Sequence, residues 1–68
     1  MMENKNVAAF RTKFFKRIAD VAMQNEKMGK DTTMAKKLIK TNIVVFKEMP
    51  EYGTDAEFKA FVDSAETV

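Results

Sequence analysis

A helix end and a helix start follow each other in residues 27–33, Lys-Met-Gly-Lys-Asp-Thr-Thr. Gly29 suits the left-handed position that commonly follows the last residue of a helix. Lys27 and Lys30 place positive charge near that end, where the helix dipole favours cations. The three residues at 31–33 are types that cap the start of the next helix. Because so few residues separate the two helices, we expect them to form an antiparallel hairpin.

Before this turn, apolar residues recur at the three- and four-residue steps of one helix, from about residue 6 to residue 28. We expect its core-facing stripe to comprise Val7, Phe10, Phe14, Ile18, Val21 and Met28. Four further residues widen the apolar sector to roughly half of the circumference, namely Ala8, Phe15, Ala19 and Ala22. A helix between two neighbours in a bundle can bury so wide a sector, and the alternative is a second contact surface for another molecule.

Residues 32–48 predict a second helix, which ends before Pro50 because proline disfavours a helical conformation in the residue before it. Its expected core-facing stripe comprises Met34, Ala35, Leu38, Asn42, Val45, Phe46 and Met49, with Ile39 and Ile43 beside it. The run at 43–46 also suits a strand, but the surrounding helical period favours a helix. The polar Asn42 either fixes the register of an oligomer or bonds a nearby carbonyl or water.

A capping box predicts the start of a third helix, at residues 55–66, in the sequence Thr54-Asp55-Ala56-Glu57. Apolar residues follow it at helical spacing, at positions 58, 61, 62 and 65. Such a helix would lie across the hairpin and bury its phenylalanines. We therefore predict an all-α fold with one domain over residues 1–68. It would be a small three-helix bundle, made of a long antiparallel hairpin and a shorter C-terminal helix, as a monomer or a dimer.

The sequence lacks residue types that catalytic and metal-binding sites often use. It has no His and no Cys, so the commonest general base, the thiol nucleophile and two main metal ligands are missing. Gly29 and Gly53 are its only glycines and do not form a phosphate-binding loop. Ser64 has no histidine to activate it. We predict no enzymatic activity, no catalytic or metal-binding residue and no cofactor.

The formal net charge of +2 conceals an uneven distribution. Residues 1–49 carry eleven Lys and Arg against five Asp and Glu, a net of +6, whereas residues 50–68 carry one Lys against five acids, a net of −4. We interpret this as an acidic helix docked on the basic part of its own fold; the alternative is a basic binding face with an acidic tail. The longest apolar run has four residues, and no signal peptide is visible, so we predict a cytoplasmic protein with no membrane partner.

A chain of 68 residues has little stability to spare, and neither a disulfide nor a zinc site can add to it. Association is the remaining source of stabilisation. We expect the second apolar surface to bind another protein, or a second copy of the chain, through Phe15, Ile39 and Ile43, with Met23 as an adaptable neighbour. The predicted function is that of a regulator or inhibitor, and the small size and the Met and Phe content suit a phage or mobile-element (viral) accessory protein.

Two other functions remain open at this stage. A small nucleic-acid-binding protein would contact phosphates through the basic helix faces, with Lys13, Lys16, Arg17, Lys36, Lys37 and Lys40. The same cations would equally serve as solvated faces that keep the bundle in solution. A structural subunit would instead assemble with copies of itself into a homo-oligomer.

Overall fold

The computed structural model describes the backbone of residues 5–68 and the side chains of residues 12–68. The described part of the chain is all-α, as predicted, with short turns between its helices and no strand. Its helices are α1 (Lys5–Lys27), α2 (Thr33–Thr41), α3 (Ile43–Glu48), α4 (Pro50–Thr54) and α5 (Ala56–Glu66). The described residues thus form five helices, where the sequence predicts three.

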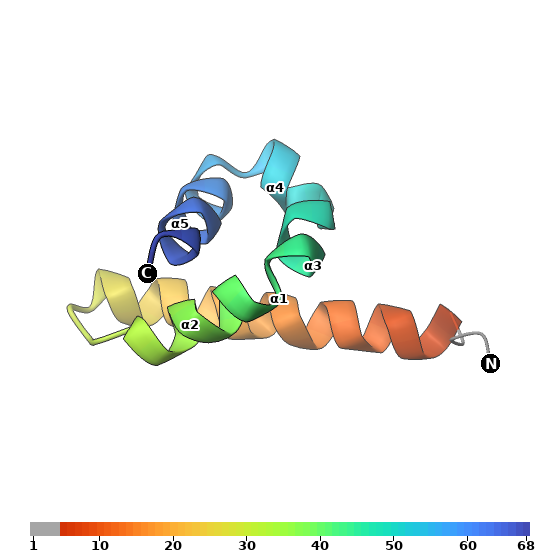
Figure 1. The fold of residues 1–68 in the computed structure, drawn as a ribbon, viewed down its shortest axis with the longest axis horizontal. Coiled ribbons are helices and arrows are strands. Elements are labelled where there is room, and N and C mark those ends of the chain that lie inside the picture. Colours follow the sequence, from red (N-terminus) through yellow and green to blue (C-terminus); the bar gives the residue numbers. More distant parts are fainter. Residues whose placement is uncertain (1–4) are drawn as a thin grey trace.

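The helices form two layers (Figure 1). The long α1 and the shorter α2 run antiparallel and pack against each other, but the second helix of the predicted hairpin ends at Thr41 and not near Glu48. Helices α3, α4 and α5 all lie on one side of this hairpin, and α5 contacts both α1 and α2. No described helix covers the opposite side of the hairpin, and the N-terminal part of α1 extends beyond the other helices (Figure 1).

The turn between α1 and α2 forms where the sequence predicts it. Gly29 adopts a φ of +78°, in the left-handed region that glycine enters without a steric cost. Its amide donates to the Glu26 carbonyl at 3.0 Å, and the Lys30 amide donates to the Asn25 carbonyl at 2.9 Å, so two carbonyls of the last turn of α1 are satisfied. At the start of α2, the Asp31 carboxylate accepts hydrogen bonds from the backbone amide and the hydroxyl of Thr33.

The predicted second helix is interrupted at Asn42. This residue has φ −114° and ψ 31°, which is not helical, and it separates α2 from α3. Its side-chain amide donates to the Leu38 carbonyl at 3.0 Å, so it competes with the backbone for that acceptor. The chain then becomes extended at Met49, before Pro50, as the proline rule predicts, and immediately starts the short α4.

The N-terminal cap of α5 is Asp55 and not Thr54, so the predicted capping box is wrong in its register. The Asp55 carboxylate accepts from the amides of Glu57 at 3.1 Å and Phe58 at 3.2 Å. Thr54 belongs to the end of α4, where its hydroxyl donates to the Pro50 carbonyl at 3.1 Å. Because Thr54 is the last residue of α4, it does not serve as the N-terminal cap of α5.

In α1 the core uses the opposite apolar side from the predicted stripe, whereas Phe46 and Met49 of the second predicted stripe are buried as expected. Buried residues gather between the two layers, namely Ala19, Ala22, Ile39, Phe46, Met49, Phe58, Phe61, Val62 and Ala65. Five members of the predicted stripes are exposed instead, namely Phe14, Val21, Met28, Met34 and Leu38. Helix α1 packs through alanines, whose small side chains let neighbouring helices approach closely. The predicted stripe also included Val7 and Phe10, which lie outside the described side chains.

Within residues 5–68, no helix has the length and apolar character needed to cross a membrane.

Candidate interaction surface

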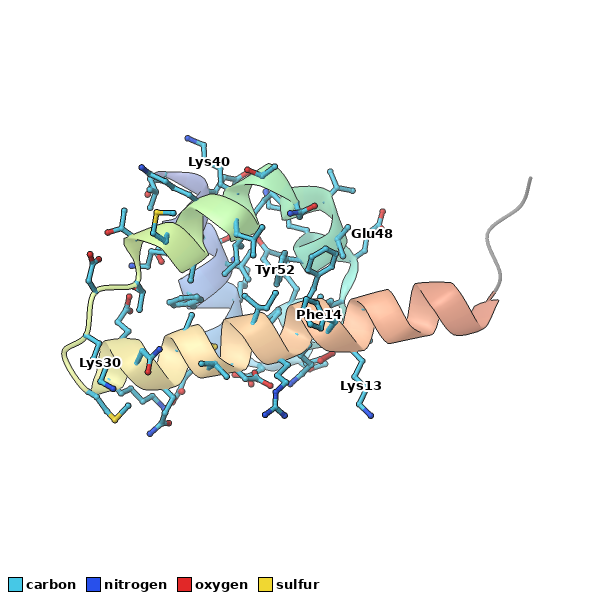
Figure 2. All side chains as sticks on the ribbon, turned by 90° about the horizontal axis from the view of Figure 1, so that it is seen from below. Lys13, Phe14, Lys30, Lys40, Glu48 and Tyr52 are labelled. Carbon is cyan, nitrogen blue, oxygen red and sulfur yellow. The ribbon has the colours of Figure 1, made fainter. Side chains whose placement is uncertain are left out.

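The uncovered side of the hairpin carries a group of apolar side chains. Figure 2 looks onto this side, opposite α4 and α5, with Phe14 labelled beside α1. Phe14 is 56% exposed, Val21 50% and Leu38 40%. Ile18 and Ala35, at helical steps from these residues, are partly exposed. We name these five residues, three from α1 and two from α2, the hairpin face.

The hairpin face contains a groove of about 330 Å³ between the two helices. The lining residues come mostly from α1 and are Phe14, Arg17, Ile18, Val21, Ala22, Asn25 and Ala35. Most of the lining side chains are apolar, and Arg17 and Asn25 supply its polar groups. Such a groove can receive a large apolar side chain of another molecule, with the polar groups setting its orientation.

Exposed cations lie on both helices of the hairpin. Arg17 lines the groove itself, and Lys13 is exposed one helical turn before it on the same side of α1. On α2, Lys37 is exposed next to Leu38 in the sequence. None of these three cations forms an ion pair with another residue that the structure describes. The α1 side of the hairpin face therefore carries positive charge, from Arg17 and Lys13, that no described acidic residue pairs with.

The residues predicted to bind a partner lie elsewhere. Ile39 is fully buried, so it offers no contact to another molecule in this conformation. Phe15 and Ile43 are partly buried and pack against the core, and the Phe15 ring lies 5.7 Å from that of Phe46. Met23 also packs on the core and lines a separate hollow of about 280 Å³. The structure does not bring these four residues together on one exposed surface.

Three of the six predicted phosphate-binding cations are engaged within the fold. Lys16 lies 2.9 Å from Asp20 and 3.8 Å from Glu51, and the hydrogen bond to Asp20 raises the pKa of Lys16. Lys36 lies 2.7 Å from Glu26. This hydrogen bond lowers the pKa of Glu26.

Lys36 also lies over the Phe61 ring, at 5.5 Å from its centroid. Lys40 donates to the Val68 carbonyl at 2.6 Å. Figure 2 shows Lys13 and Lys40 at opposite edges of the molecule. The six cations therefore do not form one continuous basic patch.

A polar cluster fastens α4 to α5. Asp63 accepts a hydrogen bond from the Tyr52 hydroxyl at 2.6 Å and another from the Lys59 ammonium at 2.8 Å. The Lys59 ammonium also lies over the Tyr52 ring, 5.2 Å from its centroid. These bonds lower the pKa of the Asp63 carboxyl, first through Lys59 and then through Tyr52, and the same contact raises the pKa of Tyr52. Each group in the cluster has its partner inside the fold, so the cluster serves the structure.

Sequence reasoning recognised both apolar stripes of α1 but assigned them in reverse, and it misplaced Met34 and Leu38 of the second stripe, which are exposed. The signal that could have identified the exposed stripe is the position of Arg17, a cation directly beside Phe14 and Ile18 on a helix, which a core-facing stripe would have to bury. In the part of the chain that the structure describes, no group of three or more acidic, His or Cys side chains could hold a metal ion. No protein-family model, no curated protein and no solved structure matches this chain significantly.

Proposed function

We propose that this chain is a non-enzymatic protein that acts by binding another protein, and that the hairpin face is its contact surface. The observation that carries this proposal is the apolar groove on the uncovered side of α1 and α2, where Phe14, Val21 and Leu38 are exposed. Contiguous exposed apolar surface with a polar border commonly marks a site of interaction in small proteins.

Energetics support the hairpin face as a binding surface. Complete burial of a large apolar side chain contributes about 1.5–3 kcal/mol, and Phe14, Val21 and Leu38 have about half of that gain still to make. Phe14 adds an aromatic ring, a type that dominates binding energy at interfaces. A partner that covers the groove would therefore stabilise the whole small fold by mass action.

A foreign partner fits this surface better than a second copy of the chain. In a two-fold symmetric dimer the same surface meets itself, so two surfaces that both carry Arg17 and Lys13 as unpaired cations would come together. Like charges brought together at an interface cost affinity. We therefore favour binding to a different protein, in which the chain acts as a regulator or inhibitor by occupying part of a larger surface. The dimer and the self-assembling subunit become outcomes of the test.

The test is a pull-down from host lysate with the tagged chain, with and without nuclease, read by mass spectrometry. Two valines make a matched pair, because both are exposed but only Val21 lines the groove, whereas Val44 lies on α3. We expect Val21→Asp to lose a stoichiometric protein partner and Val44→Asp to retain it, with circular dichroism confirming that both variants fold.

Other outcomes would contradict the proposal. Equal recovery with the two variants would place the contact outside the hairpin face. Recovery that collapses with nuclease would assign the chain to nucleic acid, and recovery of the chain alone, in a concentration-dependent assembly, would assign it to a structural subunit.

A further inference from the structure

The hairpin of α1 and α2 has one side that is already occupied by a helix. Helix α5 lies there, and its buried residues Phe58, Phe61, Val62 and Ala65 follow the i, i+3, i+4, i+7 spacing of an amphipathic helix. This is the spacing by which helices dock into apolar grooves generally. The contacts of α5 therefore show which kind of element this hairpin accepts.

Acidic residues of α5 meet cations at the border of that contact. Glu57 lies 2.9 Å from Lys27 of α1, and Glu66 lies 2.9 Å from Lys47 of α3. The inner side of the hairpin thus combines an apolar centre with one cation, Lys27, that pairs with an acidic residue of α5, and Lys47 of the neighbouring α3 adds a second such pair. The outer side repeats this combination, with the groove at its centre, Arg17 in its lining and Lys13 one helical turn before Arg17, and these two cations have no acidic partner among the described residues.

Resting on the function proposed above, we propose that the hairpin face binds an amphipathic helix with acidic flanks, supplied by the partner protein. Its apolar residues would occupy the groove between Phe14, Val21 and Ala35, and a carboxylate would pair with Arg17. The concave groove fits the ridge of side chains on a helix better than the surface of a membrane, and the cationic border selects acidic flanks.

The experiment is a nuclear magnetic resonance titration of the labelled full chain with two designed helical peptides of about 16 residues, long enough to hold helical structure. Both peptides carry the same apolar residues at i, i+3, i+4 and i+7. One has Glu at the flanking positions, and the other has Lys. We expect the acidic peptide to shift the backbone amides of Ile18, Val21 and Ala35, and to bind roughly tenfold more tightly than the basic peptide at low salt, with the difference shrinking as salt is added.

Two variants of equal charge change test the role of Arg17. Arg17→Glu alters a groove-lining cation, and Lys30→Glu makes the same change at the α1–α2 turn, outside the groove. We expect Arg17→Glu to abolish the preference for the acidic peptide and Lys30→Glu to preserve it. Val21→Asp should remove the shifts with both peptides.

The results separate this inference from the proposed function. If both peptides bind the hairpin face equally, or if neither shifts it at millimolar concentration while Val21→Asp still loses its partner from lysate, the acidic helix is wrong but the binding surface stands. If the acidic peptide binds but the pull-down does not depend on Val21, the proposed function fails instead. Signals of the hairpin face that broaden with anionic vesicles, but do not move with either peptide, would overturn the inference in favour of a membrane surface.

Discussion

Leu38 and Ile39 are neighbours in the sequence, and one helical step of about 100° places them in different surroundings. Ile39 is fully buried beneath α5, whereas Leu38 is 40% exposed on the hairpin face. We expect Ile39→Ala to lower the free energy of unfolding by about 2–5 kcal/mol, because it leaves a cavity in the core. Leu38→Ala should cost less than about 1 kcal/mol. Urea denaturation followed by circular dichroism measures both.

A chain of this size can unfold completely after a large core truncation, so Ile39→Val is the milder companion. Its expected cost is about 1 kcal/mol for the loss of one methyl group. Per carbon atom removed, this cost is larger than that of Leu38→Ala. Equal losses for Leu38→Ala and Ile39→Ala would show that Leu38 is buried in solution, and the hairpin face would then be part of the core.

Asp63 makes stability depend on pH. Hydrogen bonds from Lys59 and Tyr52 hold its folded pKa below the ordinary value of 3.8, so the unfolded chain binds a proton more readily than the folded chain. The contribution of Asp63 is therefore complete above about pH 4–5 and is lost as the pH falls through its folded pKa. We expect Asp63→Asn to be less stable than the parent chain near neutral pH, and this difference to shrink at about pH 2–3.

Urea midpoints measured across that pH range follow the effect of Asp63. The carboxylate of Asp20 is the control for this measurement, because it pairs with Lys16 within α1 and does not join two helices. A difference between the parent chain and Asp63→Asn that stays constant with pH would mean that the lost bonds do not depend on the charge of the carboxyl group.

At the scale of helices, the start of α5 depends on one carboxylate. Asp55 accepts from two amides of the first turn, while Thr54 closes α4 by bonding to Pro50. We expect Asp55→Ala to destabilise the fold by about 1 kcal/mol, the usual cost of removing an N-terminal cap, and Thr54→Ala to cost clearly less. Thermal unfolding of the two variants distinguishes them. The reverse order would restore the capping box that the sequence suggests.

Local signals in the sequence predicted the helix ends well. Gly29 follows the end of α1, and Pro50 follows the end of α3, because each of these residues restricts or permits backbone conformations by its own geometry. The interruption at Asn42 was not predicted: its bond to the Leu38 carbonyl is one of the alternatives that the sequence offered, but such a bond is also compatible with an unbroken helix. The capping box was misplaced by one residue because α4, a helix of five residues, has no periodic signal of its own.

At the scale of the molecule, the side of the hairpin that becomes the core depends on where α5 docks. Both stripes of α1 have helical spacing, so their pattern alone does not distinguish Phe14 and Val21 from Ala19 and Ala22. Tertiary packing decides which stripe of α1 faces the core, because α3, α4 and α5 all lie on one side of the hairpin (Figure 1). For the same reason the fold class could be predicted from the sequence, whereas the location of the candidate site could not.

The charge asymmetry of the chain is partly resolved inside the fold, as ion pairs between distant segments show. Lys27 near the end of α1 lies 2.9 Å from Glu57 at the start of α5, thirty residues later. The pair acts across the two layers, and hydrogen bonding to Glu57 raises the pKa of Lys27.

We expect Lys27→Glu to lower the melting temperature, because it places two carboxylates face to face, and the double exchange Lys27→Glu with Glu57→Lys to recover most of the loss. Added salt should narrow the gap between the single variant and the parent chain, since exposed charges are screened over about 8–10 Å at physiological ionic strength. If the double exchange stays as unstable as Lys27→Glu alone, the attraction between these two charges does not help to hold α5 on the hairpin, and the apolar contacts of Phe58 and Phe61 must hold it there.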